Sequence, residues 1–248
     1  MGDAKRLIIK PISYADATRI ICALHYSGKV KWGVQINLGV FLDGVCGGAM
    51  QYGPSMVGRR MAGLVSGSGL HQFLELNRLA FADWLPRNGE SRALAYSLRW
   101  LRATYPQLKW VVSFADGTQC GDGTIYRAAG FLLTQVKRNA GMLRMPDGSV
   151  VSTKTLGNKE NLAPDGRQGT AIAKEAGAVP LDGFQLRYVY FLDPTWRERL
   201  TCPVLPYSAI GEAGATMYKG KRPKQATTSV QEASGGAAPT RTLQEVTP

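Results

Sequence analysis

The segment from residue 75 to residue 130 constrains the fold of this chain most strongly, because signals for strand, helix, strand and helix follow one another within it. Residues 75–79 are strand-like, helical periodicity extends over 92–105, and the apolar run 109–115 ends at Asp116. In folds that alternate strands with helices, ligands bind at the carboxyl ends of the strands. This order therefore predicts a ligand cleft beside Asp116.

Further strands and helices are expected on both sides of this segment. Ser13 and Asp16 have the spacing of a helix cap, and Asp43-Gly44 is typical of the turn of a β-hairpin. The order of strand, helix, hairpin, strand, helix, strand, helix and two final strands predicts an α+β fold with a mixed central sheet and helices on both faces. The other expected strands are 6–12, 35–41, 45–52, 131–136 and 184–192; the first helix carries Ala17, Ile20, Ile21 and Leu24 on one face, and a short helix spans 123–129.

Length and composition favour one folded domain with a tail. The chain has 248 residues, of which 44% are hydrophobic, so it can bury a sizeable core. We expect the domain to span 1–200, with a loop-rich insertion at 139–180 that lies over the core or is partly mobile, and a C-terminal extension at 201–218. Residues 53–69 are expected to form a long loop. Residues 219–248 are basic and poor in large apolar side chains, which predicts disorder.

The charge balance favours a polyanionic partner. Thirty Lys and Arg residues against 18 Asp and Glu give a formal net charge of +12 at pH 7. Phosphates displace counterions when they bind such a surface, which makes nucleic acid the leading candidate. A protein that is basic without binding nucleic acid is the alternative, because net charge alone is a weak signal.

The cysteines argue against a structural zinc site. Cys22, Cys46, Cys120 and Cys202 are widely scattered, and only two histidines could complement them, so we interpret the cysteines as reduced thiols. No stretch of the chain reaches the ~18 apolar residues of a membrane span, and the N-terminus lacks the pattern of a signal peptide. We therefore expect a cytoplasmic protein without a membrane partner.

Four runs of residues, together with the order of elements, resemble known proteins. The order, with a phosphate-sized turn before the central helix, resembles the GCN5-related N-acetyltransferase fold. More narrowly, the chain from about Arg6 to about Leu192 resembles the Mom family of bacteriophage DNA-modification proteins. The runs that carry this resemblance are Glu75-Leu76-Asn77-Arg78-Leu79, Asn88-Gly89-Glu90-Ser91-Arg92, Val112-Ser113-Phe114-Ala115-Asp116 and Gly123-Thr124-Ile125-Tyr126-Arg127-Ala128.

The resemblance implies a particular DNA modification. Members of the Mom family convert adenine in phage DNA to N6-carbamoylmethyladenine, which protects the DNA from host restriction enzymes. This chain is accordingly expected to be a transferase in the host cell cytoplasm, with double-stranded DNA as its partner and a flipped adenine as its acceptor. Residues 1–200 would then be an acetyltransferase-like catalytic domain. Two alternatives stay open: an acyl-coenzyme A dependent N-acetyltransferase acting on a non-DNA amine, and a non-catalytic basic DNA-binding protein.

Four residues are candidates for catalysis. Asp116 follows an apolar strand, where its carboxylate could accept a proton from adenine N6 or hold the amino group. Tyr126 lies at the position where acetyltransferases commonly keep a tyrosine that protonates the leaving group. The His25-Tyr26 pair counts in the Mom family among the residues on which activity depends. The structural alternatives are an Asx turn at Asp116 and a core tyrosine at Tyr126.

The turn before the central helix is the candidate cofactor site. Its free backbone amides at a helix N-terminus suit the pyrophosphate of an acetyl-coenzyme A-like ligand, although the spacing departs from the usual acetyltransferase signature. A plain turn in which Ser91 caps the first amides is the alternative. Arg78, on an apolar strand, needs an anion to face, either a ligand phosphate or a carboxylate such as Glu75. The candidate cofactor-binding residues are Arg78, Arg87, Asn88, Gly89, Ser91 and Arg92.

Two basic loops are candidates for DNA contact, and a metal is a further hypothesis. Lys29 and Lys31 flank aromatic residues in a composition that suits a base and its backbone, and Arg59 with Arg60 lies in the predicted loop. An iron site, which has been suggested for the family, could use His25, Asp116 and Tyr26, although nothing in their spacing requires it. The sequence leaves the donor, the DNA sequence context, the oligomeric state and the role of 139–180 open.

Overall fold

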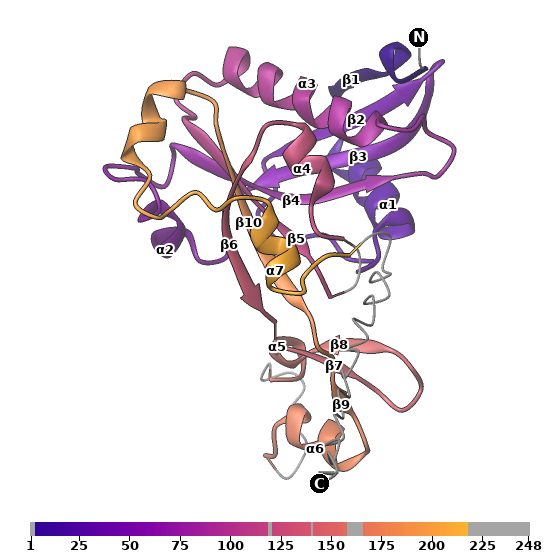
Figure 1. Cartoon of the computed structure of the whole chain (residues 1–248). Coiled ribbons are helices and arrows are strands. Elements are labelled where there is room, and N and C mark those ends of the chain that lie inside the picture. Colours follow the sequence, from indigo (N-terminus) through magenta and orange to yellow (C-terminus); the bar gives the residue numbers. More distant parts are fainter. Residues whose placement is uncertain (1–2, 119–120, 140, 158–165, 218–248) are drawn as a thin grey trace, which may run out of the picture.

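The computed structural model describes residues 3–118, 121–139, 141–157 and 166–217, and it is built around one seven-stranded sheet (Figure 1). The strand order is β1-β2-β3-β4-β5-β10-β6. All neighbouring pairs are antiparallel except β4 and β5, which are parallel, so the sheet is mixed as predicted. The strands are β1 Ile8–Pro11, β2 Ile36–Leu42, β3 Val45–Gly53, β4 Phe73–Phe81, β5 Trp110–Asp116, β6 Leu132–Arg138 and β10 Phe184–Phe191.

Helices cover both faces of this sheet. The long helix α3 (Gly89–Thr104) and the short helix α4 (Thr124–Ala128) pack on one face, and α1 (Tyr14–Leu24) packs on the other. Residues of β3 alternate between the two, since Met50 belongs to the cluster beneath α3 and Ala49 to the cluster beneath α1. The predicted α+β class is therefore confirmed.

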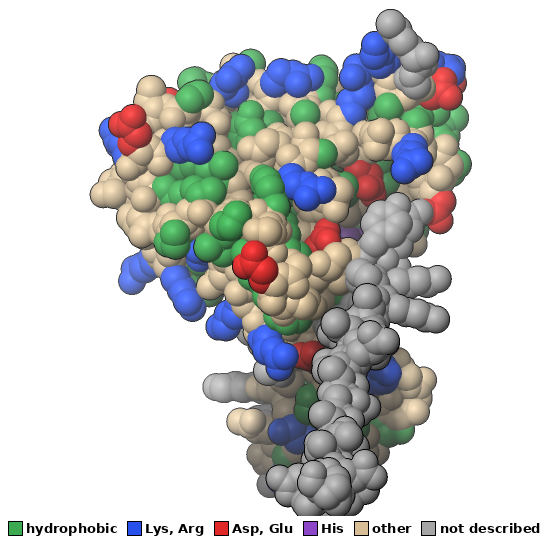
Figure 2. Space-filling view, viewed as in Figure 1, with side chains coloured by type: hydrophobic (Ala, Val, Ile, Leu, Met, Phe, Trp, Pro, Cys, Tyr) green, Lys and Arg blue, Asp and Glu red, His purple; other side chains and the backbone are tan. Residues whose placement is uncertain are grey.

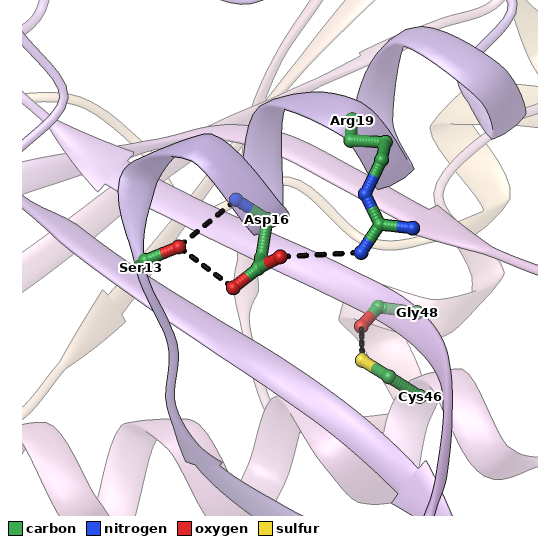
Figure 3. Close-up of polar contacts among 5 residues, drawn as sticks. All are labelled: Ser13, Asp16, Arg19, Cys46 and Gly48. Carbon is green, nitrogen blue, oxygen red and sulfur yellow. Dashed lines mark hydrogen bonds and ion pairs between the residues drawn. The ribbon is translucent and has the colours of Figure 1, made fainter.

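The first helix begins at the predicted cap. The Ser13 hydroxyl accepts a hydrogen bond from the Asp16 N–H at 3.0 Å and donates to the Asp16 carboxylate at 2.7 Å (Figure 3). The carboxylate also pairs with Arg19 at 3.1 Å. The bond from Ser13, followed by the bond from Arg19, lowers the pKa of Asp16 below its usual value. Figure 3 also shows the Cys46 thiol donating to the Gly48 carbonyl in β3.

The hairpin and the central helix also follow the sequence pattern. Asp43 and Gly44 both adopt positive φ, +49° and +84°, in the two-residue turn between β2 and β3, as expected for an Asp-Gly hairpin. On α3 the helical periodicity over 92–105 places a stripe of Leu94, Leu98 and Leu101 fully buried against the sheet, with Tyr105 partly buried after it. The packing of this stripe fixes the start of α3 beside the cleft described below.

Residues 53–69 are more regular than the predicted loop. They include the five-residue helix α2 (Gly58–Ala62), which forms because Met61 is buried against Phe73 and Trp110. The Gly- and Ser-rich composition of this segment predicts a loop. The burial of Met61 was not predictable from it, because the residues that contact Met61 are distant in the chain. Three further short helices are η1 Asp3–Arg6, η3 Pro194–Arg199 and α7 Ser208–Glu212.

The segment 139–180 also contains more regular structure than its composition predicts. Its three short strands form a separate sheet of order β8-β7-β9, with a small core of Leu143, Ala173 and Ala178. Figure 1 shows this lobe extending beyond one end of the large sheet, so the expectation that it lies over the core is wrong. The predicted disordered tail, 219–248, lies outside the described residues. The elements of the lobe are β7 Met142–Arg144, β8 Val150–Ser152, α5 Thr153–Leu156, α6 Gly169–Glu175 and β9 Val179–Pro180.

Candidate functional site

The two parallel strands separate and open a cavity between them. β4 and β5 pair only over Phe73–Glu75 and Trp110–Val112, at their amino ends. Beyond this ladder β4 also carries a bulge at Asn77, because Gln51 and Tyr52 of β3 pair with the residues on either side of it. A cavity of about 800 Å³ lies between the separated carboxyl ends, at the predicted position.

The cavity walls come from both faces of the sheet. The end of α1 and the following loop contribute from one face, and the starts of α3 and α4 contribute from the other. Residues of the small lobe, which follows β6, complete the wall. Among the residues that line the cavity are His25, Tyr26, Lys31, Glu75, Asn77, Arg78, Glu90, Asp116, Tyr126, Asn139, Met142 and Ser152.

Asp116 ends β5 with its two carboxylate oxygens engaged differently. Oδ1 accepts the Thr118 N–H at 2.8 Å, and Oδ2 accepts the Tyr26 hydroxyl at 3.2 Å. The first bond is the Asx turn considered as the structural alternative, and it fixes the orientation of the carboxylate. The second joins Asp116 to a side chain from the opposite side of the cleft. The turn and a chemical role are therefore compatible.

Tyr126 lies on the first turn of α4 and is buried in the main core, as its structural alternative predicted. Its side chain is 8% exposed and its ring contacts those of Phe131 and Tyr188, with centroids 5.4 Å and 5.0 Å away. Gly123, with φ +84°, precedes the helix, and a Cβ there would lie 2.5 Å from the Tyr188 ring. The glycine thus permits the packing that places Tyr126 on the same cavity wall as Asp116.

His25 caps the C-terminus of α1 and is held as a neutral imidazole. Its Nδ1 accepts the Ser27 N–H at 3.1 Å, so the ring proton is assigned to Nε2. Burial, and secondarily the Arg78 charge, lower the pKa of His25 to about 4. Its ring stacks on Tyr26, with centroids 4.3 Å apart. The predicted His-Tyr pair therefore enters the cleft as one rigid unit.

Glu75, the carboxylate that the sequence suggests as a partner for Arg78, pairs with Lys31. Arg78 donates to the backbone carbonyls of Lys29 and Asn77, at 2.7 Å and 2.8 Å, and among the described residues it has no ion pair. Burial lowers the pKa of the Arg78 guanidinium. Arg78 is thus a half-buried cation on the cleft wall, whereas Lys31 is committed to an ion pair.

The turn before α3 matches a phosphate site only in part. Asn88 adopts φ +65°, and no side chain caps the helix, because Ser91 donates to the Asn88 carbonyl instead of accepting an amide. The proposed Ser91 cap is therefore wrong. Arg87 and Arg92 are exposed and do not line the cavity, while the Glu90 carboxylate does. A carboxylate here opposes a pyrophosphate, so the fit to coenzyme A is incomplete.

The predicted DNA contacts do not gather in one place. The Lys29 side chain is exposed beside the cleft, but Arg59 and Arg60 lie on α2, which packs at the amino ends of β4 and β5. Figure 2 shows Lys and Arg side chains scattered over the visible face instead of forming one patch. The structure therefore separates Arg59 and Arg60 from the cleft.

A three-ligand metal cluster is not formed by the described part of the chain. No three His, Cys, Asp or Glu side chains there lie close enough to hold an ion. His25 and Asp116 do share the cavity, but His25 Nδ1 is occupied by the Ser27 N–H. The third suggested ligand, Tyr26, also lines the cavity with its hydroxyl bonded to Asp116, and an iron site formed by these three side chains stays a prediction. The same part of the chain contains no helix of the length and hydropathy that crossing a bilayer requires.

Sequence reasoning missed two contributions to the cleft. Asn77, only 6% exposed, lies at the bulge, and neither atom of its amide has a partner among the described residues. Its polarity within an apolar strand is the signal that could have identified it. Asn139, Met142 and Ser152 bring the small lobe onto the cavity wall. No local pattern reveals that contact, because it depends on where the lobe folds.

Fold and site together define a class: an α+β protein with a mixed seven-stranded sheet and a polar cleft where two parallel strands separate. A family model described as the Mom protein family matches residues 6–209. The methylcarbamoylase mom of Escherichia phage Mu is 33% identical over 202 residues, which cover 79% of this chain and 80% of that protein. The chain belongs to the Mom protein family.

Solved acetyltransferases superpose on this chain at low sequence identity and with TM-scores below 0.5. Arabidopsis thaliana NAA60 in complex with a bisubstrate analogue superposes with a TM-score of 0.45 and 12% identity, covering 75% of this chain and 97% of that chain. The ribosomal-protein-S18-alanine N-acetyltransferase from Escherichia coli gives 0.41 and 12%, covering 75% and 94%.

Proposed function

We propose that this protein is a phage DNA-modification enzyme that converts adenine in duplex DNA to N6-carbamoylmethyladenine and so protects the DNA from restriction. Membership of the Mom family, whose relative in phage Mu is named a methylcarbamoylase, supports the reaction class. The observation in this chain that supports the proposal is the convergence of Asp116, Tyr26 and Tyr126 on one cavity. The cavity volume of about 800 Å³ is large enough for a purine together with a small donor.

Adenine has to leave the base stack before it can react. Its N6 lies inside the duplex, and its lone pair is delocalised into the ring, so the enzyme extrudes the base and holds it beside the donor. The N6 nitrogen then bonds to the methylene carbon of the carbamoylmethyl group. The bond between that carbon and the leaving group breaks, and the leaving group keeps the electron pair.

The residues of the cleft divide this work. Asp116 accepts the hydrogen bond of the N6 amino group and takes the proton that N6 loses, while Thr118 and Tyr26 hold the carboxylate in place. Tyr126, which lines the same cavity, donates a proton to the leaving group. Arg78 offers a half-buried positive charge to an anionic group of the substrate or donor. No step depends on a coenzyme A pyrophosphate.

Nucleoside mass analysis tests the proposal directly. Bacteria that express the protein are expected to contain an adenosine derivative heavier by one carbamoylmethyl group in place of one hydrogen. Asp116→Asn and Tyr126→Phe are each expected to lower its amount by about 100-fold or more, because each removes a proton-transfer group. DNA binding by both variants should persist, since the basic surface is unchanged.

A matched control and two outcomes make the test decisive. Asp147→Asn removes an exposed carboxylate from the β7–β8 turn of the lobe and is expected to leave modification unchanged. Adenosine of unmodified mass throughout, with soluble protein present, would refute the proposal. Full modification by Asp116→Asn would instead refute the assignment of its role.

A further inference from the structure

The most exposed large hydrophobic residue that the structure describes stands beside the cleft. Trp32, in the loop between α1 and β2, is 91% exposed. Two other exposed apolar side chains, Leu24 at 42% and Tyr26 at 50%, precede it in the same segment and line the cavity. Leaving an indole in water forgoes the free energy of burying its large apolar surface. A cluster of such residues at a cleft indicates contact with a flat, apolar surface.

The loop that carries Trp32 is anchored to the cleft wall. The carbonyl of Lys29 accepts from Arg78 at 2.7 Å, and the Lys31 ammonium pairs with the buried carboxylate of Glu75. Both partners belong to β4, the strand that forms one side of the cavity. On its other side Trp32 is followed by Gly33, which turns with φ +76° and lies against Pro54. Trp32 is therefore held next to the cavity by fixed neighbours, with its own ring free in solvent.

Tyr26 is not available for contact with a flat, apolar surface outside the cleft. Its ring is stacked on His25 and its hydroxyl is bonded to Asp116, so it is committed to the interior of the cleft. Trp32 has the largest ring system of the segment and is exposed almost completely. The two aromatic residues thus divide between the cavity and its rim.

We propose that Trp32 is the stacking wedge for base extrusion: its indole enters the DNA stack at the position that the target adenine leaves. Extrusion removes one base from between two neighbours, and apolar or aromatic side chains can occupy such steps. The adjacent exposed cation Lys29 would meet a flanking phosphate. This inference rests on the proposed function. It assigns Trp32 as a positioning residue, because the indole acts on the duplex and not on the reacting atoms.

Fluorescence of 2-aminopurine tests the wedge separately from the chemistry. The probe replaces an adenine that nucleoside mapping shows to be modified, and it brightens when it leaves the stack. Wild-type protein is expected to brighten a fully paired duplex. Trp32→Ala should lose most of this rise and bind the duplex about tenfold more weakly, the loss of one aromatic stacking contact. Trp32→Phe, which keeps a ring, should retain most of both signals.

A duplex in which the probe base is already partly unstacked distinguishes a role in base extrusion from a purely structural role of Trp32. In a duplex whose 2-aminopurine faces an abasic site, extrusion costs less, so Trp32→Ala should bind within about twofold of wild type. Tyr14→Ala is the matched control, because Tyr14 is 51% exposed at the far end of α1. It should behave as wild type on both duplexes.

The outcomes separate this inference from the proposed function. Equal brightening by wild type and Trp32→Ala, or equal weakening of Trp32→Ala on both duplexes, would overturn the wedge while leaving the proposed modification intact. Absence of any brightening by wild type, together with unmodified cellular DNA, would overturn both.

Discussion

At the scale of single residues, the cleft is notable for a histidine kept neutral. His25 is partly buried beside the Arg78 guanidinium, and its Nδ1 already accepts a hydrogen bond from Ser27. Protonation would place a second positive charge against the first and would make Nδ1 a donor facing another donor. The neutral ring instead stacks on Tyr26, whose hydroxyl orients Asp116. Neutral His25 thus supports the carboxylate through one intermediate residue.

The stability of the protein should therefore depend on pH through His25. Its pKa is about 4 in the folded state, against about 6.5 when unfolded, so the unfolded chain binds a proton first as the pH falls. The free energy of unfolding should decrease between pH 6.5 and pH 4, no more steeply than about 1.4 kcal/mol per pH unit from this group. Urea unfolding at a series of pH values measures the slope.

The second histidine of the chain supplies the control for this prediction. His25→Gln should reduce the slope in the window between pH 4 and pH 6.5, while His71→Gln, at an exposed position, should leave it as in wild type. Identical slopes for wild type and His25→Gln would show that the histidine titrates normally in the folded protein.

At the scale of elements, a buried polar contact joins the interior strand β3 to α3. The Tyr52 hydroxyl is bonded to Ser97 Oγ, and Ser97 in turn donates to the Leu94 carbonyl at 2.7 Å. Both side chains are fully buried. The Ser97 hydroxyl has one proton, which it gives to the Leu94 carbonyl, so Tyr52 is the donor in the first bond. This chain of bonds connects the sheet to the helix whose first turn borders the cleft.

Truncating the two partners should have unequal costs. Tyr52→Phe leaves Ser97 bonded to its own helix and is expected to cost about 1 kcal/mol of unfolding free energy. Ser97→Ala leaves a buried phenol without a partner and is expected to cost more, about 2 kcal/mol. Urea denaturation of the two variants and the double variant tests this order. A larger cost for Tyr52→Phe, which keeps the ring and removes only the hydroxyl, would contradict this order and show that the phenol left by Ser97→Ala finds another partner.

The elements themselves were predictable from sequence because their signals are local. The Ser13 cap, the Asp43-Gly44 turn and the apolar stripe of α3 all depend on residues within a few positions of one another. The shape of the cleft was not predictable, because it arises where pairing between β4 and β5 stops and where β4 bulges at Asn77. Those features depend on strands that are distant in sequence.

The same limit applies to the candidate site. Asp116 was identifiable because it ends an apolar strand, whereas the family resemblance suggested Tyr126 and the His25-Tyr26 pair; the structure places all of them on one cavity. The pairing of Lys31 with Glu75 was not identifiable, since either Lys31 or Arg78 could satisfy that carboxylate on charge alone. Only the path of the loop after α1 decides between the two cations.

At the scale of the whole molecule, the distribution of charge bears on which face meets DNA. Lys and Arg side chains are scattered over the face that Figure 2 shows, so the formal charge of +12 alone does not select a binding face. The cleft opens at the carboxyl ends of β4 and β5, whereas α2 packs at their amino ends, through Met61. Along β4 the cluster of α2 contains Phe73, the first residue of the strand, whereas the cavity is lined by Glu75 to Phe81, so the two regions follow one another along the strand. A duplex whose adenine enters the cleft is therefore expected to contact Lys29 more directly than Arg59 or Arg60.

Salt dependence of DNA binding separates the two regions. Each phosphate contact contributes about 0.9 to the slope of log affinity against log salt concentration. Lys29→Ala is therefore expected to weaken binding and to lower the slope by about 1, whereas the double change Arg59→Ala with Arg60→Ala should leave the slope nearly unchanged. The double variant also controls for net charge, because it removes two positive charges and Lys29→Ala removes one. A slope lowered by about 2 in the double variant, with Lys29→Ala unchanged, would place the duplex across α2 and would require DNA bending or a second binding mode for an adenine to reach Asp116.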